Sequence, residues 1–411
     1  MGLRVVEGRA CICGWPTDTL TIDDDDLYQN DVHSTSSHDK NNPYYNAATH
    51  ITLLIFIPGN PGVIHWYTQF LVRIVEQLGE GYAVRGISYA GHGVGDDVVG
   101  TRDDHHNQIF HGKRRDGKVN ESININGHKD ISISCSMEGQ SEYIFCYYHS
   151  NMYLILNMCI IGINFLANDA IIIVKHKLEW IDKIIEEWRR LYDCVPNFIF
   201  ITHSIGAHFT QSLLLRRPDI LAKTLHIIHL MPFIRFDPPP MKKRVLSSVA
   251  KSHKYIIPIM TNLVRALSSS GLPRSWIDLY LKHVAGLDCT NGREIAIDVF
   301  MNPNMVKNHL LLGCQELNEL AEYPNDVAFR LIGAFTSTSI LFCGNDHWAP
   351  EFHFADINDM QRNFTIPDNI HAEYKEELSH DFIVHLGQVD KVVSFCVNRI
   401  RNCTKHSRSR L

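Results

Sequence analysis

A short apolar segment in the middle of the chain leads directly into an amphipathic helix, and a serine stands at the turn between them. The segment reads Phe198-Ile-Phe-Ile-Thr-His-Ser-Ile-Gly-Ala-His-Phe209, with Ser204 at the turn. A serine on such a tight strand-to-helix turn stands clear of the sheet, and the next backbone N–H can point at a developing oxyanion. The usual pattern is G-x-S-x-G, and Thr202 replaces its first glycine, so a helix-capping serine is the alternative interpretation.

Strand-like and helix-like segments alternate on both sides of this turn. Apolar β-rich runs are followed by segments with apolar residues at helical spacing, which is typical of a parallel sheet covered by helices. The sequence therefore predicts an α/β fold with a mostly parallel central sheet and helices on both faces. The expected strands are Ile51–Ile57, Tyr82–Tyr89, Phe198–Thr202, Thr224–Met231, Ser339–Cys343 and His371–Leu378, and the expected helices include 67–78, His176–Tyr192 and Ile205–Arg217.

Changes in composition divide the chain into seven parts. The predicted parts are a loosely ordered lead-in (1–48), the first part of the core (49–100), an atypical insertion (101–174), the core with the serine turn (175–236), a helical lid (237–332), the remaining core (333–400) and a basic, disordered tail (401–411).

The predicted insertion lacks both the strand and the helix period. A structureless stretch of this length inside a compact domain is unusual. It is interpreted as a surface insertion or as sequence wrongly included by the gene model. Its apolar run Tyr153–Val174 also suggests a transmembrane helix, but Asn157, Asn164 and Asp169 interrupt it and are costly in hydrocarbon.

The overall charge and the cysteines exclude several classes of function. A net charge of −6 and a pI near 6.5 provide no basic footprint, so no nucleic-acid partner is expected. The eleven cysteines follow no zinc-ligand spacing and are predicted to be free thiols. We expect no metal or organic cofactor. The N-terminal residues lack the apolar stretch of a secretory signal, so a cytosolic-facing protein is expected.

Two later motifs supply the partners that an activated serine needs. A base must lie within hydrogen-bond reach of the serine, and a carboxylate must orient that base. Asp346 follows the predicted strand Ser339–Cys343, and His380 follows the predicted strand His371–Leu378. Active groups collect at the carboxyl edge of a parallel sheet, so these positions predict a group of Ser204, Asp346 and His380.

Other histidines and aspartates are alternatives for the base and the acid. His371 is expected within a strand and His385 in the middle of a helix, while His347 is poorly placed to be oriented by its neighbour Asp346. The alternative carboxylates are Asp356 and Asp359, which lie on a predicted helix and are interpreted as solvated charges.

The oxyanion would be bound by two backbone N–H groups. One is the N–H of Ile205, and the other comes from the loop Pro58-Gly-Asn-Pro-Gly62, where Asn60 is the candidate. Pro61 favours an extended conformation of Asn60, and the glycines let the backbone approach a ligand closely. The alternative interpretation of this loop is a tight turn.

Together these motifs resemble the lipid-droplet-associated hydrolases, a family within the α/β-hydrolase superfamily. The resemblance spans about 350 residues in a preserved order. It rests on Ile57-Pro-Gly-Asn-Pro-Gly62 with His65-Trp66-Tyr67, Ser88-Tyr-Ala-Gly-His92, His203-Ser-Ile-Gly206, Gly344–Pro350 and His380. It implies an α/β-hydrolase fold with a helical lid inserted between nucleophile and acid. By that resemblance Ser204 corresponds to the nucleophile, Asp346 to the acid and His380 to the base.

The resemblance also implies a location and a substrate class. The expected protein is a serine ester hydrolase of lipid droplets and endoplasmic reticulum, on the cytosolic face, with sterol and other lipid esters as substrates. The departures from the family pattern are Thr202, the sequence Asp237-Pro-Pro-Pro240 and the insertion. The alternative is a lipid-droplet surface protein that retains the fold with little or no catalysis. An epoxide hydrolase or dehalogenase is disfavoured because these use Asp at the position of Ser204.

Part of the predicted lid is a candidate for contact with lipid. The segment Tyr255–Leu267 is apolar but too short to span a bilayer. It is able to lie in a lipid monolayer, with Trp276 and Lys282 as anchors, or else to pack only on the core.

Overall fold

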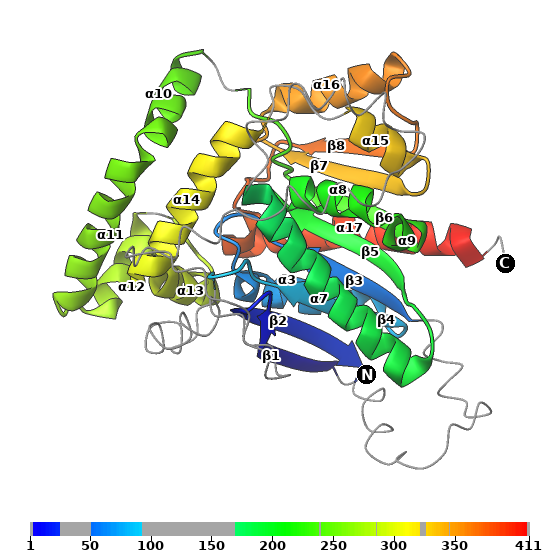
Figure 1. The fold of residues 1–411 in the computed structure, drawn as a ribbon, viewed down its shortest axis with the longest axis horizontal. Coiled ribbons are helices and arrows are strands. Elements are labelled where there is room, and N and C mark those ends of the chain that lie inside the picture. Colours follow the sequence, from blue (N-terminus) through cyan, green and yellow to red (C-terminus); the bar gives the residue numbers. More distant parts are fainter. Residues whose placement is uncertain are drawn as a thin grey trace, which may run out of the picture.

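One mixed sheet forms the centre of the part of the chain that the structure describes (Figure 1). The structure is a computed structural model that describes residues 3–24, 51–92, 169–237, 240–284, 286–320, 326–344 and 346–408. The sheet has eight strands in the order β1-β2-β4-β3-β5-β6-β7-β8. Strands β3 to β8 are parallel to one another, whereas β2 runs antiparallel to both of its neighbours, β1 and β4. The strands are β1 (Leu3–Ile12), β2 (Trp15–Asp24), β3 (Thr52–Ile57), β4 (Tyr82–Ile87), β5 (Asn197–His203), β6 (Thr224–Leu230), β7 (Ser337–Cys343) and β8 (Ile370–Lys375).

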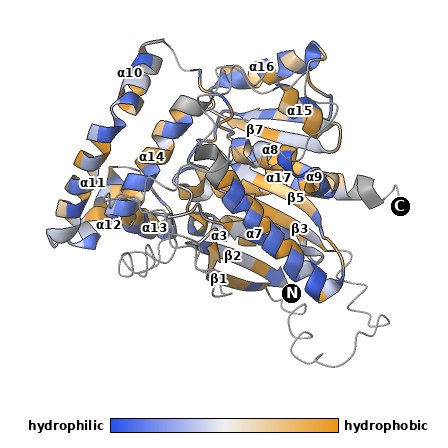
Figure 2. Cartoon of the chain, viewed as in Figure 1, coloured by the Kyte–Doolittle hydropathy of each residue, from blue (hydrophilic) through white to orange (hydrophobic). Residues whose placement is uncertain are grey.

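Helices cover both faces of the sheet, because the central strands are apolar on both sides. Leu53 and Ile55 of β3 pack in one hydrophobic cluster with α7 and α8, while Leu54 and Phe56 pack in a second with α3 and α17. The apolar colour of β3 and β5 in Figure 2 reflects this double burial. The predicted α/β-hydrolase fold is therefore confirmed. The core helices are η1 (Ile64–Tyr67), α3 (Thr68–Leu78), α7 (Asp169–Tyr192), α8 (Gly206–Arg216), α9 (Pro218–Ala222), α15 (Asp326–Gly333), α16 (Glu351–Arg362), η4 (Phe382–Val384) and α17 (Leu386–Arg408).

A block of helices between β6 and β7 stands beside the sheet, at the left of Figure 1. Within it α14 packs against α10, α11 and α13. The predicted helical segment is present, but α15 packs on α8 and β7 and thus belongs to the core layer, so the predicted lid boundary at 332 is too late. The helices of the block are α10 (Pro240–Lys251), α11 (His253–Ser269), α12 (Arg274–His283), α13 (Thr290–Phe300) and α14 (Pro303–Glu319).

The ends of the chain are more regular than predicted. Residues 3–24 of the expected loose lead-in form the β1–β2 hairpin, because Leu20 and Ile22 are fully buried and β2 pairs with β4. The expected tail is also partly wrong, since α17 continues to Arg408. Residues 25–48 of the lead-in lie outside the described residues.

The predicted insertion lies mostly outside the described residues as well. Its last six positions, 169–174, are the first turns of α7, where Val174 is buried in the core. In the described ranges, no helix is both long and apolar enough to cross a membrane. The eight cysteines in those ranges are free thiols.

Candidate active site

The serine turn has the geometry that its sequence predicts. Ser204 follows β5 directly and has a φ of +52°, a left-handed conformation that is costly for a residue with a side chain. Its backbone N–H bonds the carbonyl oxygen of Leu230 at 3.0 Å, which fixes the turn to β6. Helix α8 begins two residues later at Gly206. The turn thus lifts the Ser204 side chain above the sheet.

The threonine that replaces the first glycine of the usual pattern fits the turn. Thr202 is fully buried, and its Oγ1 lies 2.7 Å from Nδ1 of His229 on the neighbouring strand. The close approach between helix and strand occurs at Gly206 instead. A Cβ added there would lie 2.5 Å from the carbonyl oxygen of Ile57, closer than real Cβ atoms come.

Three side chains from three strand ends form a continuous hydrogen-bonded row. His380 Nε2 lies 2.9 Å from Ser204 Oγ, and His380 Nδ1 lies 2.8 Å from Asp346 Oδ2. Asp346 follows β7 and His380 follows β8, so both stand at the same sheet edge as Ser204. The structure therefore brings together the three residues that the sequence selected; their catalytic roles stay predictions.

The carboxylate is held in its charged form. Burial by itself would raise the pKa of Asp346, but the hydrogen bond and positive charge of His380 and two backbone N–H groups lower it to about 2. Those N–H groups belong to Trp348 and Ala349 and lie 2.7 and 3.0 Å from Oδ1. Oδ2 is left for His380 and for a weaker contact from the thiol of Cys343 at 3.4 Å. A fixed anion beside Nδ1 favours the imidazole tautomer with a bare Nε2.

The alternative acids and bases stand elsewhere. His347 and His371 are exposed. The prediction that His385 is inside a helix is wrong, because it precedes α17, and it pairs with Asp381 at 3.4 Å. As expected, Asp356 and Asp359 lie on α16, where they pair with Arg235 and Arg362.

The loop 58–62 lies directly against the serine turn. A Cβ added to Gly59 would lie 2.7 Å from Ser204 Cβ, so only glycine permits this approach. The side chain of the candidate donor residue Asn60 bonds His309 of α14, with 2.7 Å between Oδ1 and Nδ1. Ile205, the other candidate, is the N-cap residue of α8. The oxyanion role of both N–H groups stays a prediction.

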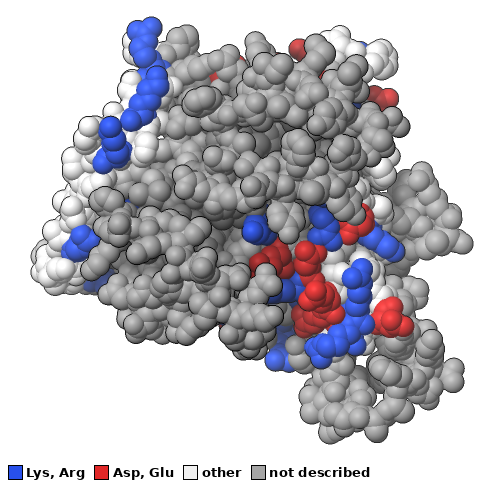
Figure 3. Space-filling view, viewed as in Figure 1, with Lys and Arg blue, Asp and Glu red and all other residues white. Residues whose placement is uncertain are grey.

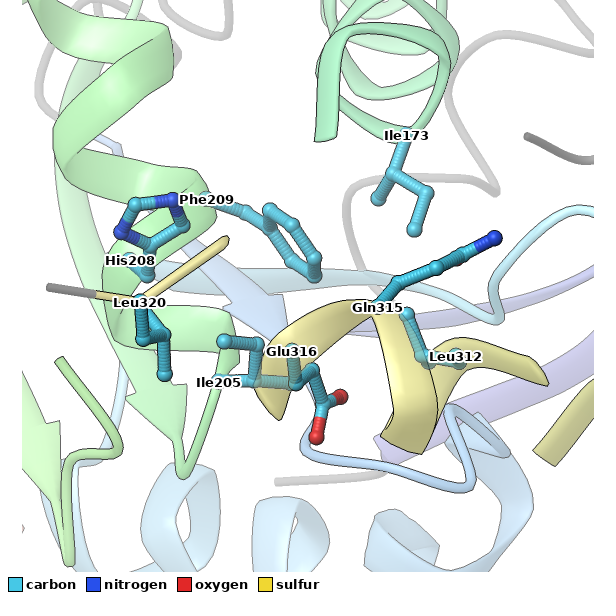
Figure 4. A pocket seen from close by; sticks show the side chains of 8 residues that line it. All are labelled: Ile173, Ile205, His208, Phe209, Leu312, Gln315, Glu316 and Leu320. Atoms are coloured by element: carbon cyan, nitrogen blue, oxygen red, sulfur yellow. The ribbon is translucent and has the colours of Figure 1, made fainter. Parts of the chain in front are cut away.

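A small apolar cavity lies beside Ile205, between α7, α8 and α14 (Figure 4). Its volume is about 10 Å³, which is enough for about one water molecule. In Figure 4 Ile173 of α7 points down from above, Leu312 and Gln315 of α14 lie below it, and Phe209 of α8 lies beside them. The lining residues are Ile173, Ile205, His208, Phe209, Leu312, Gln315, Glu316 and Leu320.

Two residues beside the row received no role in the sequence analysis. His203 bonds the backbone oxygen of His380, and Tyr67 bonds His203. Both residues lie in the motifs quoted above, which was the only sequence signal for them. Their hydrogen-bond partners are far away in the sequence, so the contacts themselves could not be predicted. Across the described ranges, no group of three or more His, Cys, Asp and Glu side chains has the arrangement of a metal site.

Comparison with known proteins gives one family match. The sequence model of the family described as "Lipid-droplet associated hydrolase" matches residues 50–117 and 173–383, which is more than half of the chain. The unmatched stretch between the two ranges falls inside the predicted insertion. No curated protein matches the sequence.

Several solved structures are similar to this chain over most of its length, at low identity. The epoxide hydrolase VrEH1 from Vigna radiata is 11% identical with a TM-score of 0.49, covering 97% of this chain and 98% of that one. The haloalkane dehalogenase DatA from Agrobacterium tumefaciens C58 is 12% identical with a TM-score of 0.47, covering 98% and 97%. The peroxisomal α/β-hydrolase Lpx1 from Saccharomyces cerevisiae is 13% identical with a TM-score of 0.45, covering 98% and 88%.

Proposed function

This chain belongs to the lipid-droplet-associated hydrolase family, and from that membership we propose that it is a serine ester hydrolase of lipid esters, sterol esters among them. The observation that carries the proposal is the row from Ser204 through His380 to Asp346, with 2.9 and 2.8 Å between the partners. A serine hydroxyl is a weak nucleophile until a base takes its proton, and the row supplies that base and its orienting carboxylate.

The proposed reaction passes through an acyl-enzyme. Ser204 Oγ attacks the ester carbonyl carbon while His380 Nε2 takes the hydroxyl proton. The N–H groups of Ile205 and Asn60 stabilise the oxyanion that forms on the carbonyl oxygen. The C–O bond to the alcohol then breaks, and His380 returns the proton to the departing alcohol oxygen. A water molecule, deprotonated by His380, releases the fatty acid and restores the serine. Asp346 stabilises the positive imidazolium in both steps, and no metal or organic cofactor takes part.

We propose that the block α10–α14 is a lid whose movement admits the substrate. Pockets for ligands of drug size usually enclose about 300–1,000 Å³. The cavity beside Ile205 has a volume of about 10 Å³, so it has no room for an acyl chain while α14 lies against α8. The contact between His309 of α14 and Asn60 means that lid movement also affects the oxyanion loop.

The outer face of this block fits a lipid monolayer. Tyr255, Ile259, Leu263 and Leu267 recur every four residues of α11, which places them on one face, and each is between 42% and 66% exposed. The opposite stripe, Ile257, Thr261 and Val264, is buried, where α11 packs on α14.

Exposed aromatic residues lie on the next helix, and basic residues lie along α10. Trp276 and Tyr280 of α12 are more than half exposed, and Figure 3 shows Lys and Arg side chains along the edge where α10 lies. Apolar residues beside basic ones favour a surface with anionic lipid heads. We therefore propose that α11 and α12 dock on lipid droplets and on the cytosolic face of the endoplasmic reticulum.

Labelling by a fluorophosphonate probe tests the nucleophile. Purified protein should be labelled, and Ser204→Ala and His380→Ala should each abolish labelling. Ser394→Ala, which changes an exposed serine of α17 whose hydroxyl bonds the backbone oxygen of Asp390, is the matched control and should be labelled like the wild type. A folded wild-type protein that the probe does not label would refute the catalytic proposal and favour a surface protein that retains the fold without the activity.

Flotation with artificial lipid droplets tests the docking face. Removing one large apolar contact costs about 1.5–3 kcal/mol, or about ten- to a hundredfold in binding. Ile259→Asp and Trp276→Asp should each weaken droplet binding by at least about tenfold. The matched control is Phe364→Asp, which changes a side chain that is 88% exposed in the turn after α16. Equal binding of all three variants would refute docking through α11 and α12.

A further inference from the structure

A second row of hydrogen bonds, separate from that of Ser204, His380 and Asp346, joins the glycine-rich loop 58–62 to the segment that carries His380. Its centre is His203, the residue before Ser204, which is 5% exposed. His203 Nδ1 lies 2.7 Å from Tyr67 Oη, and His203 Nε2 lies 2.9 Å from the backbone oxygen of His380. Tyr67 is 2% exposed and is also hydrogen-bonded by the backbone of Gly59.

The direction of each hydrogen bond in this row follows from the chemistry of its ends. A backbone carbonyl oxygen only accepts, so Nε2 of His203 must carry the proton that it donates to His380. In a neutral ring Nδ1 is then the acceptor, and the hydroxyl of Tyr67 must donate to it. The oxygen of Tyr67 in turn accepts a hydrogen bond from the N–H of Gly59. Burial raises the pKa of that phenol, and this hydrogen bond offsets only part of the rise.

The ring of His203 is neutral over the range in which a hydrolase works. Burial and the nearby positive charge of His380 lower its pKa to about 3. His203 therefore exchanges no proton in the reaction, and its two nitrogens keep fixed donor and acceptor roles.

His380 needs such an anchor because it stands in a turn between β8 and η4. On one side this turn is held by the Ser379 N–H and hydroxyl, which both bond Oε1 of Gln388 at 2.8 and 3.0 Å. On the other side it is held by His203, whose ring also packs 5.0 Å from that of His380 and 5.5 Å from that of Phe382. His203 and Ser204 are consecutive, so this second anchor fixes the base to the strand end that carries the nucleophile.

We propose that His203, oriented by Tyr67, is a positioning residue that holds the backbone of His380 at the distance from Ser204 that proton transfer requires. Through Tyr67 and Gly59 the same row fixes the base relative to the oxyanion loop. This inference rests on the proposed serine-hydrolase function. A histidine that served only the core would contribute to stability without changing the turnover of the folded enzyme.

The experiment compares turnover among folded variants. We would measure kcat and KM of the full chain with a water-soluble p-nitrophenyl ester, below the unfolding temperature of each variant. His203→Ala should lower kcat about 10- to 100-fold at nearly constant KM, because misplacement of a catalytic group by about 1 Å costs about 100-fold. His203→Gln keeps an N–H donor for His380 and should recover most of the lost kcat.

A second variant and a matched control separate positioning from packing. Tyr67→Phe keeps the buried ring and should lower kcat several-fold in the wild type but not in the His203→Ala background, because the two act through one row. His226→Gln is the control, because His226 is a buried strand histidine whose ring bonds Ser337 and Ser339. The kcat of this variant should equal that of the wild type.

The possible outcomes distinguish this inference from the proposed function. A wild-type protein inactive toward both the ester and the fluorophosphonate would refute the proposed function and the inference with it. An active wild type with unchanged kcat in folded His203→Ala would overturn the inference alone. If His203→Ala does not fold, unchanged kcat in folded Tyr67→Phe would overturn it equally.

Discussion

The contact between α8 and β3 makes a quantitative prediction for Gly206→Ala. An added Cβ would lie 2.5 Å from the carbonyl oxygen of Ile57 and 2.7 Å from that of Pro58. Real Cβ atoms essentially never approach closer than 3.0 Å, so the helix and the loop must separate by at least about 0.5 Å, the difference between 3.0 and 2.5 Å. Both neighbours are backbone atoms, which have no rotamer to change.

The cost follows from that separation. Overpacking of a well-packed core costs about 1–3 kcal/mol, so the free energy of unfolding should fall by that amount. The same shift moves the Ser204 turn relative to loop 58–62. If about 1 Å of misplacement costs about 100-fold in rate, about 0.5 Å should cost about tenfold.

Two measurements on purified protein check both numbers. Chemical denaturation gives the free energy of unfolding, and the rate of fluorophosphonate labelling gives the reactivity of Ser204. Gly387→Ala is the matched control, because an added Cβ meets nothing within 4 Å at that position of α17. It should label at the wild-type rate and be no less stable, since alanine favours a helix over glycine by about 0.5–1 kcal/mol. Wild-type stability and labelling in Gly206→Ala would refute the inferred close approach.

Three further predictions concern groups around the site and the hairpin. Asp346→Asn should lower kcat by about 10⁴-fold, because the ring of His380 loses the carboxylate that fixes its tautomer, whereas an unchanged pre-steady-state rate would contradict this role. Thr202→Val leaves Nδ1 of buried His229 without its partner and should cost about 1–3 kcal/mol in denaturation while labelling stays within about twofold. Burial opposes the charge on His65, but Asp18 and Glu7, each 3.3 Å away, raise its pKa to about 9. The protonated form is therefore favoured by folding, so its contribution is complete below pH 6.5 and is lost as the pH rises through 9. The free energy of unfolding should fall by about 2–3 kcal/mol between these pH values, a figure reduced for solvent screening because Glu7 is half exposed. His65→Gln should abolish this dependence of the free energy of unfolding on pH.

The strand and helix pattern could be predicted because it depends on local periodicity. The turn at Ser204 was predicted within a residue, since α8 begins at Gly206 and β5 ends at His203. The hairpin of residues 3–24 was missed because β1 is exposed along most of its length and the hairpin is held to the sheet by the pairing of β2 with β4. The continuation of α17 to Arg408 was missed for a similar reason, because its basic sequence resembles a solvated tail.

The candidate row was selected from the order of motifs along the chain. Ser204, Asp346 and His380 each follow a predicted strand, and the carboxyl ends of parallel strands meet at one edge of a sheet. Sequence could therefore choose His380 over His371 and His385. The accommodation of Thr202 could not be predicted, because its partner His229 is on a strand 27 positions away.

The sequence by itself determined the order of the parallel strands β3 to β8 and of the helices that cover them, the apolar faces that pack them and the residues that stand at the strand ends, since each depends on neighbours within a few positions. Only the tertiary structure decided which N–H groups hold Asp346, how His203 and Tyr67 hold His380, and how closely Gly59 and Gly206 approach their neighbours. Those contacts join segments up to 177 positions apart. Hydrogen bonds and close contacts of this kind depend on tenths of an ångström, which packing of the whole domain fixes and local sequence does not.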